Sequence, residues 1–101
     1  MVNENLKIFA NKRKCEAIVS SNNCKEKEIL TKKHFEVKLS IYDKASKNFN
    51  RDEMIKQYGD LLIELNSKKI EEIDPIDFQT ITGKLEAIGE LIIKDKIILE
   101  I

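Results

Sequence analysis

The chain has 101 residues, of which 42% are hydrophobic and 36% are charged, and its 18 Lys and Arg residues balance 18 Asp and Glu residues. We therefore expect one domain spanning residues 1–101, because this length supports a single modest core. The balanced charge offers no global field to attract nucleic acid or a membrane, and the absence of tryptophan argues against binding by base stacking.

The first half of the chain has the patterns of β-strands. Residues 6–20 carry a broken alternation of apolar side chains, interrupted by a polar bend at 11–14, and predict a strand or a bent pair of strands. Residues 21–23 predict a turn, because short polar side chains compete for backbone hydrogen bonds. In residues 34–42, apolar side chains alternate with polar ones, and this period of two predicts a strand with one buried face.

After residue 50 the period of the apolar residues changes to that of a helix. Tyr58, Leu61, Leu62 and Leu65 recur at positions i, i+3, i+4 and i+7, which is the stripe of an amphipathic helix. The pattern leaves open whether this helix begins near Arg51 or near Tyr58.

The residues at 74–75 predict the start of a second helix. Asp74 offers an N-cap carboxylate, and Pro75 suits the first helical position. Behind them an apolar stripe runs through residues 78–92. The polar pair at 94–95 is expected to end this helix, and residues 96–101 predict a final strand.

These elements predict an α+β fold in the order β-β-α-α-β, with two helices on one face of an antiparallel sheet. Such a small sheet leaves at least one edge unpaired, and unpaired edges recruit other chains. The run at 97–99 is too apolar for an edge strand that faces solvent. We therefore expect a homo-oligomer that forms through sheet edges.

The cysteines and the histidine indicate the compartment and the absence of a metal. Cys15 and Cys24 fit no metal-binding or redox spacing, and in this Lys- and Glu-rich chain they indicate reduced thiols in the cytoplasm. The first five residues contain no apolar run of a secretory signal, and no apolar stretch is long enough to span a membrane. We expect His34 on a strand surface and no metal, since zinc needs three or four arranged ligands.

Glu28, the strand around Phe35, the segment 58–60 and the helix at 78–92 occur in an order that resembles the dihydroneopterin aldolase family. The resemblance implies the tunnelling fold, in which subunits join their sheets into a barrel around a central hole. It also implies a cytoplasmic lyase of folate biosynthesis, which cleaves dihydroneopterin to hydroxymethyl-dihydropterin and glycolaldehyde without a metal or an organic cofactor.

The same resemblance implies a pterin site. Tyr58 would relay a proton, which a phenol with an ordinary pKa near 10 can do if a cation lowers that pKa, and Glu28 would orient water or substrate. Thr82 stands where the family places a glutamate that grips the pterin, and Glu86, one turn later, could replace it only if the substrate shifted. The family's lysine after the final strand has no counterpart here, because the chain ends first.

Each of these residues also has a simpler interpretation. Tyr58 suits the edge of a core, Glu28 belongs to a charged run at 25–28, and Thr82 can bond its own helix backbone. The basic groups at 12–14 and 32–33 are interleaved with acids and suit a solvated surface. A second functional hypothesis follows: a non-catalytic protein with a tunnelling-like fold, used for assembly or partner binding through its sheet edge.

Overall fold

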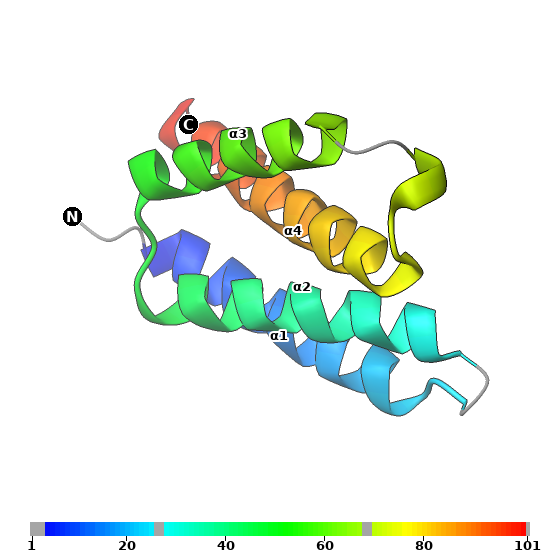
Figure 1. Ribbon diagram of the computed structural model, residues 1–101. Coiled ribbons are helices and arrows are strands. Elements are labelled where there is room, and N and C mark those ends of the chain that lie inside the picture. Colours follow the sequence, from blue (N-terminus) through cyan, green and yellow to red (C-terminus); the bar gives the residue numbers. More distant parts are fainter. Residues whose placement is uncertain (1–3, 26–27, 68–69, 101) are drawn as a thin grey trace.

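The protein is a bundle of four α-helices in the computed structural model, which describes residues 4–25, 28–67 and 70–100 (Figure 1). The helices are α1 (Glu4–Asn22), α2 (Ile29–Lys47), α3 (Arg51–Ser67) and α4 (Pro75–Glu100), and a short 3-10 helix, η1 (Ile70–Glu72), precedes α4. None of the described residues belongs to a strand.

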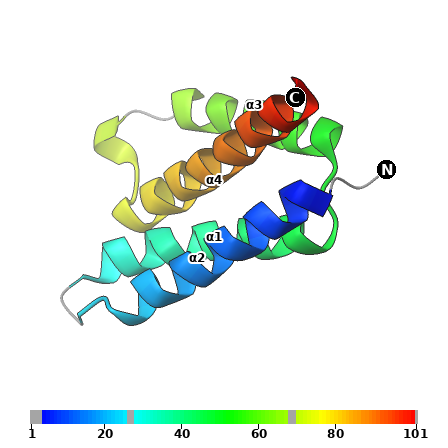
Figure 2. The same cartoon turned by 180° about the vertical axis from the view of Figure 1, so that it is seen from behind.

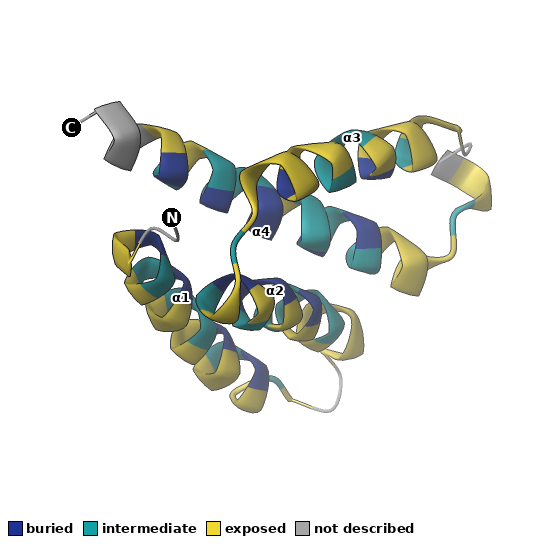
Figure 3. Ribbon diagram, turned by 90° about the vertical axis from the view of Figure 1, so that its left-hand side faces the viewer, coloured by how far each residue is buried: buried dark blue, intermediate teal, exposed yellow. Residues whose placement is uncertain are grey.

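The helices form two hairpins stacked as two layers. α1 packs most extensively on α2, while α3 packs chiefly on α4. α4 joins the layers, because it also packs on α2 and more lightly on α1. Seen from behind, α4 lies between α3 and the α1–α2 hairpin (Figure 2). Figure 3 shows that the buried faces of the two layers are turned toward each other.

Polar caps set the starts of the two later helices. The Asp74 carboxylate accepts a hydrogen bond from the Ile76 backbone N–H at 2.8 Å, and Pro75 occupies the first position of α4, where no N–H is needed. The Asn50 side chain accepts a hydrogen bond from the Glu53 backbone N–H at 3.0 Å, so α3 begins at Arg51. Both predicted helices are therefore confirmed, and the open start of the first lies at Arg51.

The predicted α+β fold is wrong, and the segment 34–42 shows why. It lies within α2, where Val37, Ile41 and Ala45 are buried at a spacing of four residues. Apolar residues four positions apart share one face of a helix, and they also share one face of a strand. The alternation alone therefore did not distinguish a helix from a strand. Nothing between Ile29 and Lys47 breaks a helix, because this stretch lacks both glycine and proline.

Two further strand predictions are wrong for different reasons. Residues 6–20 lie in α1, whose buried residues Leu6, Ala10, Ala17 and Ser21 are mostly small and give a weak apolar signal. Residues 96–100 continue α4, because the polar pair at 94–95 does not interrupt the backbone hydrogen bonds; the predicted last residue of that strand, Ile101, lies outside the described residues. The turn predicted at 21–23 begins only at its last residue, because Ser21 and Asn22 still belong to α1.

The bundle is flat and exposes more surface than its mass requires. It measures 42 × 33 × 19 Å, and its radius of gyration of 14.3 Å exceeds the roughly 13 Å of a compact domain of this length. Its accessible surface is 6896 Å², whereas a compact monomer of 11.7 kDa exposes about 5,900 Å². About 1,000 Å² of additional surface therefore faces solvent.

Candidate functional site

The structure disperses the four residues of the expected pterin site. Glu28 is exposed just before α2, in the connection that follows α1, and its side chain makes no capping hydrogen bond. The Thr82 hydroxyl donates a hydrogen bond to the Phe78 carbonyl oxygen at 2.7 Å, within α4. The Glu86 carboxylate contacts the His34 imidazole of α2. Tyr58 and Glu86 line a common groove, but Glu28 and Thr82 are not among its lining residues.

The resemblance to the dihydroneopterin aldolase family is wrong, because a tunnelling fold is built on a sheet and the described residues form only helices. The lyase activity in folate biosynthesis that it implied has no support in this structure. Association through sheet edges is equally without a basis in the described chain. His34 does not lie on a strand but on α2, where its side chain is mostly buried beside Glu86.

A groove over α4 is formed by three of the helices together. It has a volume of about 490 Å³. Its floor is α4, and its two walls are Tyr58 of α3 and Phe9 of α1. The lining residues are Phe9, Tyr58, Leu85, Glu86, Gly89, Glu90, Ile93 and Lys94.

A second hollow extends the groove toward the start of α3. It has a volume of about 320 Å³ and shares Tyr58, Gly89 and Ile93 with the first. Ile55 and Ile92 complete its lining, so every side chain around it is apolar or aromatic. The two hollows together make a continuous apolar surface along the α3–α4 hairpin.

Gly89 sets the depth of this groove. A Cβ atom at this position would lie 3.3 Å from Cε2 of Tyr58, so the missing side chain lets the tyrosine ring lie close against α4. Glycine in a helix interior costs about 1 kcal/mol relative to alanine, which makes a close contact the physical reason for its presence. The groove is thus built by one small residue and one aromatic ring.

Large apolar side chains in and beside the groove face solvent. Ile93 is 62% exposed and Ile55 is 50% exposed. A single exposed isoleucine is ordinary, but apolar side chains gathered on one concave surface mark a binding site for protein or another apolar ligand.

Charged side chains border the apolar floor on α4. The Lys94 ammonium lies 5.1 Å from the centre of the Phe9 ring, which holds the lysine at the edge of the groove. Glu86, one turn before Gly89, stands on the same lining and pairs with His34. The groove therefore carries two acids, Glu86 and Glu90, and one base, Lys94, which follow one another along α4 at intervals of four residues.

Glu90 belongs both to the groove and to a polar network beneath it. Its Oε1 lies 2.6 Å from Nε of Arg13 on α1, and its Oε2 accepts hydrogen bonds from Arg13 Nη2 at 3.3 Å and from the Tyr42 hydroxyl of α2 at 2.9 Å. The Arg13 guanidinium also lies 5.5 Å from the centre of the Tyr42 ring. These contacts connect three helices through one carboxylate.

The network changes the proton affinity of the phenol. Burial, reinforced by the hydrogen bond to Glu90 and by that negative charge, raises the pKa of Tyr42 to about 12, although Arg13 acts in the opposite direction. Burial lowers the pKa of Arg13, but the hydrogen bond to Glu90 and further contacts outweigh it and leave that pKa above its ordinary value. Tyr42 is therefore neutral and Arg13 charged at physiological pH, a state suited to a structural link.

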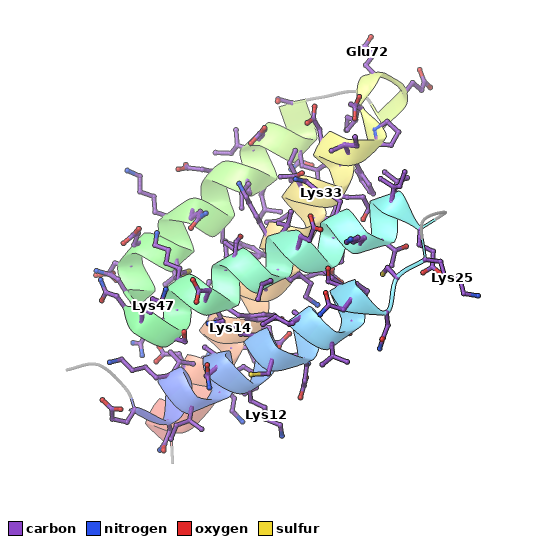
Figure 4. The ribbon with its side chains drawn as sticks, turned by 90° about the horizontal axis from the view of Figure 1, so that it is seen from below. Lys12, Lys14, Lys25, Lys33, Lys47 and Glu72 are labelled. Carbon is purple, nitrogen blue, oxygen red and sulfur yellow. The ribbon has the colours of Figure 1, made fainter. Side chains whose placement is uncertain are left out.

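The basic residues of α1 and α2 are spread along the hairpin, and two of them share one acidic partner. Lys14 and Lys47 both pair with Asp43, at 2.8 and 3.2 Å. Their hydrogen bonds, first that of Lys14, lower the pKa of Asp43. Figure 4 shows the labelled lysines at separate places along the α1–α2 hairpin: Lys12, Lys14, Lys25, Lys33 and Lys47.

The described residues lack both a metal-binding cluster and a membrane-spanning helix. No group of three or more His, Cys, Asp and Glu side chains in these parts of the chain is placed to hold a metal ion. None of the helices, as far as the structure describes them, combines the length and the apolar character needed to cross a membrane.

Comparison with known proteins identifies no relative. No family model matches the sequence, no curated protein matches it, and no solved structure matches its fold. The groove must therefore be interpreted from its own chemistry.

Sequence reasoning singled out Tyr58 and Glu86, which line the groove, but missed Phe9, Gly89 and Ile93. Gly89 carried a usable signal, because a glycine within a strong helical stripe indicates a close approach. Phe9 had none, since its place beside α4 depends on how the two layers stack.

Proposed function

We propose that this protein is a helical interaction module that binds an amphipathic helix in the groove over α4. The observation that carries the proposal is the continuous apolar surface from Ile55 through Gly89 to Ile93, walled by Tyr58 and Phe9. An amphipathic helix laid in an apolar groove is a recurrent mode of protein recognition.

The open form of the groove suits a helix. Its two hollows adjoin along α4 and share three lining residues, so together they form a track instead of a closed pocket. A closed pocket would suit a small molecule, which requires burial of most of its surface. The apolar floor would receive the apolar face of the ligand, and Glu86 and Lys94 would meet its polar flanks.

The chemistry of the site favours binding over catalysis. Glu86 pairs with His34, and Glu90 is held by Arg13 and Tyr42. The two carboxylates that line the groove thus have partners within the protein, as expected of groups that orient helices. A catalytic pair would instead be aimed at a reacting atom.

A fluorescent reporter can test the proposal, because the chain contains no tryptophan. Ile93→Trp places an indole in the groove, and Ile63→Trp places one on α3 at a position that is 69% exposed and does not line the groove. Each variant is titrated, at high dilution, with a synthetic amphipathic helix that carries leucine at positions i, i+3, i+4 and i+7.

The peptide is expected to shift the emission of the Ile93→Trp variant to shorter wavelength in a saturable manner, since the indole becomes buried. The Ile63→Trp variant should show no shift. A response of equal size in both variants, or none in either at high peptide concentration, would refute a helix-binding groove over α4.

A further inference from the structure

We infer that the occupant of the groove is a second copy of this chain, with the two α4 helices antiparallel about a two-fold axis near Gly89 and Glu90. This inference rests on the proposed function and specifies its partner. It replaces the sheet edge of the sequence-based expectation with a helical face. Three properties of the chain support a second copy as the partner.

The first property is the area of exposed surface. The chain exposes about 1,000 Å² more than a compact monomer of its mass, and a stable interface of standard size buries about 800 Å² on each partner. The surplus is therefore large enough for one interface. The groove and the exposed side chains Ile55 and Ile93 lie on the same side of the α3–α4 hairpin, where such an interface would form.

The second property is self-complementary charge. A two-fold interface joins the same patch on both subunits, so each residue i that faces residue j is matched by j facing i. With the axis at residue 90, Glu86 of each copy lies opposite Lys94 of the other, and the Glu90 carboxylate at the axis is held by Arg13 and Tyr42 of its own chain. Both residues line the groove at its border, so the arrangement forms two ion pairs between opposite charges.

The same register aligns the apolar floor. Leu85 and Ile93 lie five and three residues from this axis, so Leu85 of one copy lies about 3 Å along the helix from Ile93 of the other. Gly89 lies beside the axis, and the Tyr58 ring that packs on it would form part of the interface. The charged pairs therefore set the register, and the apolar side chains fit within it.

The third property is the net charge. The chain carries equal numbers of basic and acidic residues, so two copies have no net repulsion to overcome. A partner of different sequence would need its own charges placed to match Glu86 and Lys94. A second copy already provides them.

The test uses the full chain in analytical ultracentrifugation over a range of concentrations. The wild-type mass is expected to rise from 11.7 kDa toward twice that value as concentration increases. Ile93→Glu should remain monomeric, because it places a charge in the apolar floor. Ile63→Glu is the matched control on α3 and should dimerise like the wild type, and circular dichroism should show equal helicity in all three proteins.

A charge exchange tests the register. Glu86→Lys and Lys94→Glu should each raise the dissociation constant about tenfold or more, because each creates two like-charged pairs. The double variant E86K/K94E should restore dimerisation toward the wild-type value. Within one chain the two positions are more than two helical turns apart, so a direct contact between them cannot explain the rescue.

Each outcome decides one part of the inference. A wild type that stays monomeric at every concentration overturns self-association, while binding of the synthetic helix at Ile93→Trp would still uphold the proposed function. A dimer that survives Ile93→Glu places the interface elsewhere and overturns the inference. Dimerisation that the double charge exchange does not restore overturns the antiparallel register.

Discussion

Two glycines in helices offer a sharp test of the packing, because the structure assigns opposite consequences to the same substitution. Gly83 is buried on α4 where it meets α2: a Cβ atom there would lie 3.1 Å from the His34 carbonyl oxygen and 3.3 Å from two atoms of Val37. Gly59, on α3, has no atom within 4 Å of the same constructed position.

The magnitudes follow from these contacts. Alanine is favoured over glycine in a helix by about 1 kcal/mol, so Gly59→Ala should raise the free energy of unfolding by about 0.5 to 1 kcal/mol. Gly83→Ala has the same intrinsic gain but must push a backbone carbonyl of α2 away. Overpacking of this kind costs about 1 to 3 kcal/mol, so the net effect should be a loss of about 1 kcal/mol.

Urea unfolding followed by circular dichroism measures both variants against the wild type. The two free energies should differ by about 2 kcal/mol, which corresponds to a difference of roughly 8 to 16 °C in melting temperature for a domain of this size. The free energy of unfolding of Gly89→Ala should lie between those of the other two variants, because the neighbour of Gly89 is the Tyr58 ring at the border of an open groove. If Gly83→Ala stabilised the protein as much as Gly59→Ala does, the close packing of α2 on α4 would be wrong.

Three further predictions concern polar groups. Burial raises the pKa of Tyr42 to about 12, so between pH 10 and 12 the native state keeps a proton that the unfolded chain loses. The contribution of Tyr42 to the free energy of unfolding should therefore be intact below pH 10 and fall by roughly 2 kcal/mol between pH 10 and 12. Tyr42→Phe should lack this decline in urea unfolding across the pH series, and parallel curves would contradict the assignment. Arg51→Ala strands the buried carboxylate of Asp95 and should lower the unfolding free energy by about 1 kcal/mol more than Lys44→Ala, which removes only an exposed ion pair; equal losses would contradict the buried pair. Asp74→Ala should cost about 1 kcal/mol by removing the cap of α4, whereas Asp74→Asn should retain most of it, and equal melting temperatures would count against the cap.

The second half of the fold could be predicted from the sequence because its signals are local. The Asp74–Pro75 pair marks a helix start by its own backbone chemistry, and the stripe that includes Tyr58 and Leu61 fits only a period near 3.6. In α2, by contrast, Val37 and Ile41 satisfy both periods, and only the length of the unbroken segment favoured a helix.

The first helix could not be predicted from the sequence, because its packing depends on a contact between residues far apart in the chain. The middle of its buried side holds Arg13, a residue that a sequence pattern assigns to solvent. Its partner Glu90 lies 77 residues later, so no local pattern could reveal that the charge is matched. The groove was hidden in the same way, because its walls Phe9 and Tyr58 come from different helices.

The polar network beneath the groove has a consequence for binding. Each residue along an α-helix is rotated by about 100° from the one before it, so the rotation of α4 about its axis decides which side chains face outward. Glu90 points toward Arg13 and Tyr42, and this contact orients the neighbouring Gly89 and the later Ile93 toward the groove. Apolar packing alone tolerates small rotations, whereas a carboxylate that contacts two different helices does not. These partly buried charges therefore fix the rotation of α4 and, with it, the face that α4 turns outward.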